Sequence, residues 1–210
     1  MRMISRQFGR PRGLLGRFIG RGMARSNADF SRWVVHVLRQ DVQGEDVRIV
    51  ELGHGPGVGL EETLQLFPRA NVWGFDPSPE MMSQSRRRNR AGVRAGRLTL
   101  AVGGAERLAG ITPVDAVFAN HVLYFWHEPE AEMRRIHASL RPGGLLALGY
   151  QLKHNMPPVA QKYFPLDGHL LYEVDDQLDS LLRAAGFTNI RRRLKGSPGA
   201  PEGRLALATA

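Results

Sequence analysis

Hydrophobic residues in this chain recur with two periods, one typical of buried strands and one typical of helices. Short apolar runs that end in glycine or a polar residue predict strands. These runs are residues 47–52, 72–76, 98–102, 114–120 and 145–150. Between them apolar residues fall at helical spacing, as in Leu60, Leu64 and Phe67. Alternating strands and helices predict an α/β domain built on a mostly parallel sheet.

Both ends of the chain extend this pattern. Phe30, Trp33, Val34, Val37 and Leu38 predict an amphipathic helix for which Ser26 is the expected N-cap. After residue 150, a long connection covers residues 151–173 and a further helix ends at Gly186. Residues 187–194 and 204–209 then predict two final strands, antiparallel to each other, with a turn-rich loop between them.

The first strand leads directly into a glycine-rich turn. Glu51 and Leu52 close the strand, and Gly53, Gly55 and Gly57 follow at alternate positions before the next helix. Such a unit near the start of an α/β domain indicates a nucleotide-type site beyond the carboxyl end of the strand. A dinucleotide fingerprint would need its third glycine at position 58. That position is Val58, so the dinucleotide pattern fails.

The second strand ends in an acid, Asp76. In nucleotide-binding α/β folds, an acid at this place accepts hydrogen bonds from the ribose hydroxyls. The alternative is a helix-capping aspartate before Pro77 and Ser78. We favour ribose binding because the glycine turn precedes it.

Taken together, these motifs resemble the class I S-adenosylmethionine-dependent methyltransferases. The resemblance rests on the Glu51-to-Gly57 motif, on Asp76 and on the string Leu-Arg-Pro-Gly-Gly at residues 140–144 before an apolar strand. It covers about residues 47–150 and more loosely the C-terminal part. It implies a three-layer Rossmann-like α/β fold with a seven-stranded, mostly parallel sheet and a C-terminal antiparallel hairpin. It also implies S-adenosylmethionine as cofactor and S-adenosylhomocysteine as product.

The resemblance assigns cofactor contacts residue by residue. Glu51 is placed near the methionine end, the glycines along the backbone path, Asp76 at the ribose and Ala105 near the base. Many relatives have an acid where Gly104 stands, and it binds the adenine amino group. Here the backbone around Gly104 and Ala105 is expected to hold the base instead. The full cofactor set is Glu51, Gly53, His54, Gly55, Gly57, Asp76, Pro77, Met81, Gly104, Ala105 and Asn120.

The residues that follow the fourth strand are implied to face the methyl acceptor. These acceptor-side candidates are His121, Tyr124 and Trp126. Aromatic rings are suitable neighbours for a sulfonium or an amine through cation–π attraction. A histidine here could accept a proton near neutral pH. The competing interpretations are core packing for the aromatic rings and a structural role for His121.

The connection at residues 151–173 is long enough to predict a functional role, and we expect it to wall the acceptor pocket. Its histidines, His154 and His169, belong to no recognisable cluster of metal ligands, so no metal is expected.

Charge is concentrated at the start of the chain. The net charge is +9, and residues 1–25 hold seven of the 29 lysines and arginines and no acid. This basic segment is expected to be a lid over the site, a contact for an anionic membrane surface, a nucleic-acid arm or a solvated extension. Residues 26–210 are expected to form the methyltransferase domain.

Composition indicates the cellular compartment and the source of the protein. The absence of cysteine excludes disulfides and thiolate metal sites. No apolar run approaches about 20 residues, and the start lacks the apolar core of a secretory signal. These features predict a cytoplasmic protein, and the preference for arginine over lysine suggests a high-GC bacterial source.

The sequence thus predicts an enzyme that transfers a methyl group from S-adenosylmethionine to an unidentified acceptor, with a small molecule as the first candidate. One alternative is a non-catalytic S-adenosylmethionine-binding protein, motivated by Gly104 and the lack of a sure base. Another is methylation of a lipid head group, motivated by the basic start. The acceptor atom, the use of a general base and the oligomeric state stay open.

Overall fold

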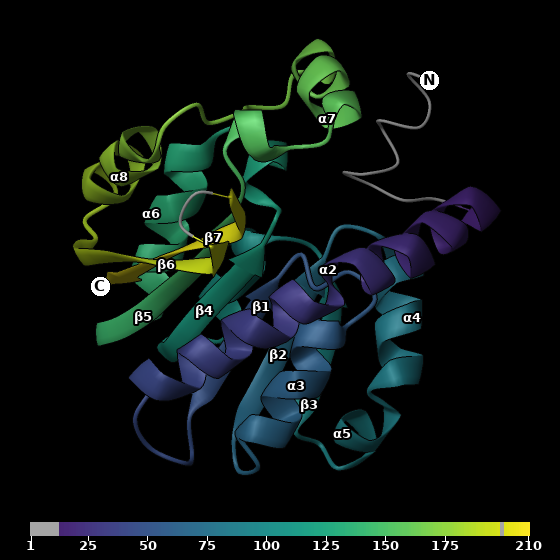
Figure 1. Ribbon diagram of the computed structural model, residues 1–210. Coiled ribbons are helices and arrows are strands. Elements are labelled where there is room, and N and C mark those ends of the chain that lie inside the picture. Colours follow the sequence, from purple (N-terminus) through teal and green to yellow (C-terminus); the bar gives the residue numbers. More distant parts are fainter. Residues whose placement is uncertain (1–12, 198–199) are drawn as a thin grey trace.

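A computed structural model describes residues 13–197 and 200–210, and the side chains of residues 27–197 and 201–210. Its centre is a 7-stranded sheet with the order β3-β2-β1-β4-β5-β7-β6 (Figure 1). The strands are β1 (Arg48–Leu52), β2 (Asn71–Asp76), β3 (Leu98–Val102), β4 (Val114–Asn120), β5 (Leu140–Tyr150), β6 (Thr188–Ser197) and β7 (Ala200–Thr209). Strands β1 to β5 are parallel, and β7 lies antiparallel between β5 and β6.

Helices cover both faces of this sheet. They are α2 (Gly13–Asp41), α3 (Val58–Leu66), α4 (Pro79–Arg88), α5 (Arg90–Arg94), α6 (Pro129–Ser139), α7 (Pro158–Tyr163) and α8 (Asp175–Ala184). Short 3₁₀ turns are η1 (Ala105–Gly110), η2 (Leu123–Phe125), η3 (Lys153–Asn155) and η4 (Pro165–Asp167). Helices α2 and α3 lie on the near face of the sheet in Figure 1.

The core has two parts, one on each face. Ile49 packs with α2 and α3, whereas the next residue, Val50, packs with α6 and α8. Successive side chains of a strand point to opposite faces, so an apolar run such as that of β1 is buried on both. The predicted three-layer α/β architecture is therefore confirmed, including the C-terminal antiparallel hairpin.

Several boundaries differ from the predictions, among them the start of β5 at Leu140 rather than Leu145 and the end of β6 at Ser197 rather than Leu194. Helix α2 begins at Gly13 and includes Ser26, so the predicted N-cap at Ser26 is wrong. Once a helix has formed, each residue added to its end gains one backbone hydrogen bond while only its own φ and ψ become fixed. This gain outweighs the modest unfavourable helix propensity of serine or glycine. Strand β7 begins at Ala200 rather than Arg204, because hairpin pairing continues close to the turn.

The basic segment lies largely outside the part of the chain that can be described. Residues 1–12 are outside the described residues, and only the backbone is described for residues 13–26. The interpretation of this segment as a lid or as an anionic contact therefore stays a prediction. Within the described part of the chain, no helix combines the length and the apolar character needed to span a bilayer.

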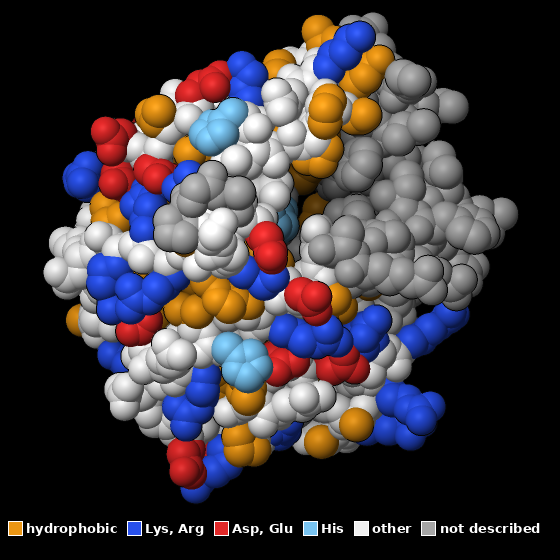
Figure 2. All heavy atoms as spheres, in the orientation of Figure 1, with side chains coloured by type: hydrophobic (Ala, Val, Ile, Leu, Met, Phe, Trp, Pro, Cys, Tyr) orange, Lys and Arg blue, Asp and Glu red, His pale blue; other side chains and the backbone are white. Residues whose placement is uncertain are grey.

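The long connection after β5 is folded into η3, α7 and η4. The backbone N–H of Leu170 donates to the carbonyl of Tyr124 at 3.1 Å, and the rings of Phe125 and Phe164 lie 5.3 Å apart. These contacts attach the connection to η2, which follows β4. Val159 and Leu166 stay exposed on it, and Figure 2 shows hydrophobic side chains gathered at α7 with a hollow beneath them.

Candidate functional site

The glycine turn after β1 lies where neighbouring segments leave no room for side chains. Gly53 has φ +65°, and a Cβ there would clash with the side chain of Val122, which follows β4. Gly57 has φ +83°, and a Cβ there would lie 2.6 Å from Asn89 Nδ2 on the other side. Asn89 Nδ2 donates to the carbonyl of Gly57 at 3.0 Å. The turn is thus fixed between the end of β4 and the end of α4.

Gly55 is the open point of this turn. Apart from its two neighbours in the chain, no atom of the described residues lies within 4 Å of where its Cβ would be, although its φ is +52°. Its N–H donates to Asp76 Oδ2 at 2.8 Å, and the N–H of Ser78 donates to Asp76 Oδ1 at the same distance. The carboxylate of Asp76 therefore joins the turn after β1 to the turn after β2. Because an ionised carboxylate offers about four acceptor sites, it keeps capacity for two further donors.

Two more ionisable residues are buried beside Asp76. Glu51 is 3% exposed, and burial raises its pKa well above the usual range, with a further rise from the charge of Asp76. The Glu51 carboxylate lies against Gly59 at the start of α3, and its Oε2 is buried without a hydrogen-bond partner among the described residues. Burial also raises the pKa of Asp76, against the opposing effects of His54 and the N–H groups of Gly55 and Ser78.

His54 completes this buried group. Its Nδ1 lies 2.7 Å from the carbonyl oxygen of Gly55, so Nδ1 carries the proton and donates. Burial lowers the pKa of His54, which keeps the ring neutral. The other ring nitrogen, Nε2, is then an acceptor, and within the described part of the chain it is buried with no hydrogen-bond partner.

The end of β4 forms the other side of the site. Both polar atoms of the Asn120 side chain are buried and have no hydrogen-bond partner in residues 27–197 and 201–210, and Gly149 of β5 leaves room for the Asn120 Oδ1. His121 follows with φ +55°, an unusual backbone conformation for a residue with a side chain. Its ring lies 4.7 Å from that of Phe30, and burial lowers its pKa to about 4. His121 is therefore neutral at pH 7 and can accept a hydrogen bond, but its lowered pKa makes it a weak base.

The other two acceptor-side candidates, Tyr124 and Trp126, have different surroundings in the fold. Tyr124 is 3% exposed, its hydroxyl accepts from the N–H of Gln151 at 2.5 Å, and it donates to the Gln151 carbonyl at 3.2 Å. The Tyr124 hydroxyl is therefore already engaged by the backbone. Trp126 is partly buried and packs against the edge of the core on the α6 side.

The segment after β3 lies directly beside Asp76. The N–H of Gly103 donates to the Asp76 carbonyl at 3.1 Å, and Ala105 is buried at the start of η1. The N–H of Gly104 donates to Glu106 Oε1 at 2.8 Å. Pro77 and the buried Met81 follow Asp76 into α4. The carboxyl ends of β1, β2, β3 and β4 thus hold the predicted cofactor residues along one edge of the sheet.

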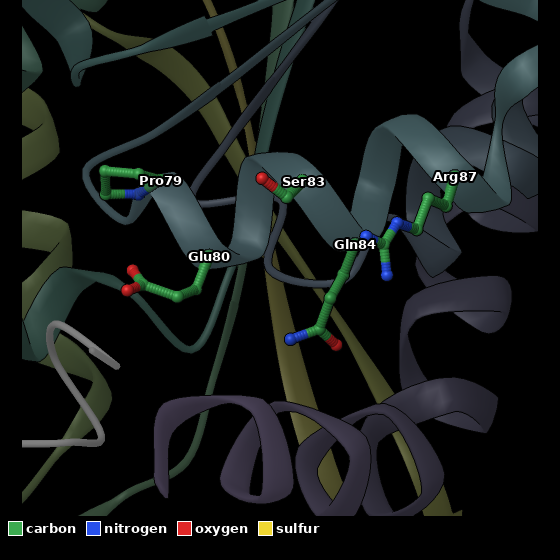
Figure 3. A pocket seen from close by; sticks show the side chains of 5 residues that line it. All are labelled: Pro79, Glu80, Ser83, Gln84 and Arg87. Carbon is green, nitrogen blue, oxygen red and sulfur yellow. The ribbon is translucent and has the colours of Figure 1, made fainter. Parts of the chain in front are cut away.

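A separate pocket of about 250 Å³ runs along α4 (Figure 3). It is lined by Pro79, Glu80, Ser83, Gln84 and Arg87. None of the predicted cofactor residues lines it, and in Figure 3 Gln84 extends toward α2. We therefore place the site at the strand ends and not in this pocket.

Two residues at the carboxyl ends of these strands, Phe30 and Glu106, were not predicted from the sequence. Phe30 was assigned only to a core helix, and its apolar spacing carries no signal that its ring meets His121. Glu106 was not singled out, although an acid two positions beyond a glycine pair could have drawn attention to it. Among the residues that the structure describes, no group of three or more histidines and acids could hold a metal ion.

Known proteins share both sequence and fold with this chain. Residues 50–146 match the family model described as a methyltransferase domain. Over 101 residues the chain is 37% identical to trans-aconitate 2-methyltransferase from Methylobacterium nodulans, a match that covers 48% of this chain and 37% of that relative. A trans-aconitate 2-methyltransferase from Variovorax paradoxus is 34% identical over 104 residues, covering 50% of this chain and 38% of its own length. The chain thus spans little more than a third of the length of these relatives.

Solved structures extend the likeness to most of the chain. An O-methyltransferase family protein from Burkholderia thailandensis superposes with a TM-score of 0.70 at 18% identity, covering 91% of this chain and 58% of its own. Phosphoethanolamine N-methyltransferase 2 from Haemonchus contortus, in complex with S-adenosyl-L-methionine, has a TM-score of 0.66 at 18% identity, covering 84% and 52%. At these identities the likeness is one of fold.

Proposed function

We propose that this chain transfers a methyl group from S-adenosylmethionine to a small-molecule acceptor, because residues 50–146 match a methyltransferase domain and the chain is similar in fold to a methyltransferase solved with S-adenosyl-L-methionine. The observation that carries the proposal is the hydrogen bond between Gly55 N–H and Asp76 Oδ2. It joins an open stretch of backbone after β1 to a buried acid at the end of β2, beside the switch point of the sheet between β1 and β4.

The residues present fit this cofactor. Glu51 Oε2, His54 Nε2 and the Asn120 amide are buried polar atoms that have no hydrogen-bond partner among the described residues. Buried polar groups without partners cost free energy, so their convergence on one edge indicates a polar ligand. The space beside Gly55 allows that ligand to approach the backbone.

In this proposal each group has a definite role. Asp76 accepts from the ribose hydroxyls with its two remaining acceptor sites. Glu51 and Asn120 lie toward the methionine end, while Pro77, Met81, Gly104 and Ala105 flank the base. The cofactor supplies a methyl group on a sulfonium, which is already a good leaving group.

The protein then needs to orient an acceptor and exclude water more than it needs strong acid–base catalysis. Orientation alone contributes effective molarities of up to about 10⁵–10⁸ M. His121, neutral at pH 7, can hold the acceptor by a hydrogen bond to its ring nitrogen. Trp126 and the folded connection that bears α7 are the proposed outer wall of the acceptor side.

The comparisons suggest the class of acceptor. The relatives named for trans-aconitate and phosphoethanolamine act on small polar molecules that carry acidic groups. We propose a small molecule of this kind before a lipid head group, because both relatives are named for small polar substrates.

Calorimetry with S-adenosylhomocysteine tests the cofactor site. We expect wild type to bind and Asp76→Ala to bind about 100-fold more weakly, because two hydrogen bonds to a charged group are lost. Asp46→Ala is the matched control, since Asp46 is an exposed acid paired with Arg69. Thermal melting verifies that each variant is folded, and unchanged affinity in a folded Asp76→Ala protein would remove Asp76 from the site.

Turnover separates the enzyme from a non-catalytic binding protein. A screen of small carboxylic acids, phosphate esters and amines with labelled S-adenosylmethionine should yield a methylated product. Binding of S-adenosylmethionine without transfer to any acceptor would favour the binding protein.

A further inference from the structure

The pocket along α4 lies apart from the cofactor residues and is large enough for a small ligand. Its volume is about 250 Å³, and it is lined by Pro79, Glu80, Ser83, Gln84 and Arg87. Helix α4 packs against α2, beside the first half of that helix in Figure 1. Because Gln84 extends from α4 toward α2 in Figure 3, the pocket opens between these two helices.

The amide of Gln84 has an unused donor in this pocket. Its Nε2 is buried and has no hydrogen-bond partner among the described residues. A buried donor without a partner costs free energy unless water or a ligand accepts from it. Gln84 therefore offers a donor to a ligand between α4 and α2.

Arg87 brings an unpaired positive charge to the same pocket. Within the described part of the chain, its guanidinium has no ion pair and no hydrogen bond. The next residue, Arg88, is by contrast paired with Glu61 at 2.9 Å. Arg87 lies three positions after Gln84, so the two side chains are neighbours on one face of the helix. A guanidinium group binds carboxylate and phosphate by two parallel hydrogen bonds.

Charge restricts a negative group to one end of this pocket. Glu80 is the one acid among the described lining residues, and it accepts from Ser78 Oγ at 3.3 Å. It lies seven positions before Arg87, which is about 10 Å along a helix. The facing half of α2 adds no negative charge, since residues 13–26 hold three arginines and no acid. The Arg87 end of the pocket is therefore electropositive.

We propose that this pocket binds a small oxyanion, a phosphate or a carboxylate group, through Arg87 and Gln84. Arg87 supplies two donors and Gln84 Nε2 supplies a third, while Glu80 keeps the anion at the Arg87 end. A bound anion also offsets the repulsion between Arg87 and the basic residues 13–26 of α2. The site is separate from the cofactor residues and does not depend on the proposed function.

Calorimetry of the full chain with inorganic phosphate and with succinate tests this site. We expect one saturable site for at least one of the two anions in a low-chloride buffer. Arg87→Ala and Gln84→Ala should each weaken binding by about tenfold, because each removes hydrogen bonds to a charged group. The bound anion should also raise the melting temperature of wild type but not that of Arg87→Ala.

Two further variants separate a built site from a general attraction of anions. Arg86→Ala removes the same charge from a neighbouring position that does not line the pocket, and it should keep the wild-type affinity. Glu80→Gln should tighten binding, because it removes the negative charge at the other end of the pocket. Thermal melting without anion verifies that each variant is folded.

Binding of neither anion, or equal losses in Arg86→Ala and Arg87→Ala, would overturn the proposal. Competition between the anion and S-adenosylhomocysteine would also overturn it, because the anion would then occupy the cofactor site. If wild type fails to bind S-adenosylhomocysteine but binds the anion through Arg87 and Gln84, the proposed function fails and this site stands.

Discussion

Among individual residues, the most unusual are the buried acids of the site. Glu51 and Asp76 lie in the interior with no basic side chain paired to either carboxylate among the described residues. Burying an unpaired charge is costly, so such groups raise their pKa or await a partner. A sulfonium cofactor brings positive charge to this place. These buried acids therefore lower the stability of the cofactor-free protein.

Replacing Glu51 tests whether its buried carboxylate lowers the stability of the cofactor-free protein. We expect Glu51→Gln to stabilise the cofactor-free protein at neutral pH and to weaken binding of S-adenosylmethionine. The folded-state pKa of Glu51 is raised above its unfolded value of about 4.3, so wild-type stability falls as the pH rises from there toward the folded pKa. The variant lacks this loss, and its advantage should be on the order of 1 kcal/mol at pH 7.5 and small at pH 4.5.

Urea unfolding at the two pH values provides this measurement. Glu45→Gln, which changes an exposed acid beside Arg69, is the control and should be nearly neutral at both. A Glu51→Gln protein that is no more stable than wild type at pH 7.5 would contradict the assigned cost of the buried acid.

Among the elements, the glycine turn after β1 is shaped by helices α3 and α4, which meet at it. Gly57 is the N-cap of α3 in a left-handed conformation, and a Cβ there would clash with Ser85 and crowd Asn89 at the end of α4. The turn is thus specified by α4 as much as by its own glycines. That contact keeps the Gly55 N–H directed at Asp76.

A pair of alanine substitutions separates backbone strain from this contact. Gly57→Ala should cost about 3 kcal/mol of unfolding free energy, from a strained φ and from crowding against α4. Gly96→Ala, also at positive φ (+71°) but with nothing within 4 Å of its Cβ, should cost only about 1 kcal/mol. Urea unfolding measures both, and equal losses would show that contact with α4 does not specify the turn.

At the scale of the molecule, Phe30 links segments far apart in the sequence. Its ring lies against Gly149 of β5 and Gly203 of β7 and contacts the ring of His121. Helix α2 is therefore positioned by two glycines that leave room for one aromatic ring. The same ring helps to remove His121 from water and so keeps that histidine neutral.

Removing this ring should change both stability and the titration of His121. Phe30→Ala should lose about 3–5 kcal/mol of stability and raise the pKa of His121 from about 4 toward 6.5, because water enters beside the imidazole. Nuclear magnetic resonance of labelled histidine follows the titration, with His121→Asn identifying the signal. Phe67→Ala, a buried ring in the same part of the core, should lose similar stability with no change at His121. A His121 titration that is equal in both variants would exclude the link.

Much of the fold could be predicted from local patterns, because strand and helix periods are properties of neighbouring residues. The parallel strands, the antiparallel hairpin and the glycine turn are confirmed by the structure. The start of α2 was missed because a helix boundary depends on propagation along the chain and not only on a capping residue. The engagement of the Tyr124 hydroxyl by Gln151 was equally invisible, since 27 residues separate them.

The sequence by itself determined the order of strands and helices, the unit formed by the glycine turn and Asp76, and the methyltransferase resemblance. These depend on spacing along one chain, where covalent geometry limits the choices. Only the tertiary structure decided that Glu106 lies over Gly104, that Phe30 meets His121 and that Glu51 and Asn120 are buried without partners. Those facts depend on contacts between distant segments, and packing in three dimensions sets both the contacts and the cost of burying charge.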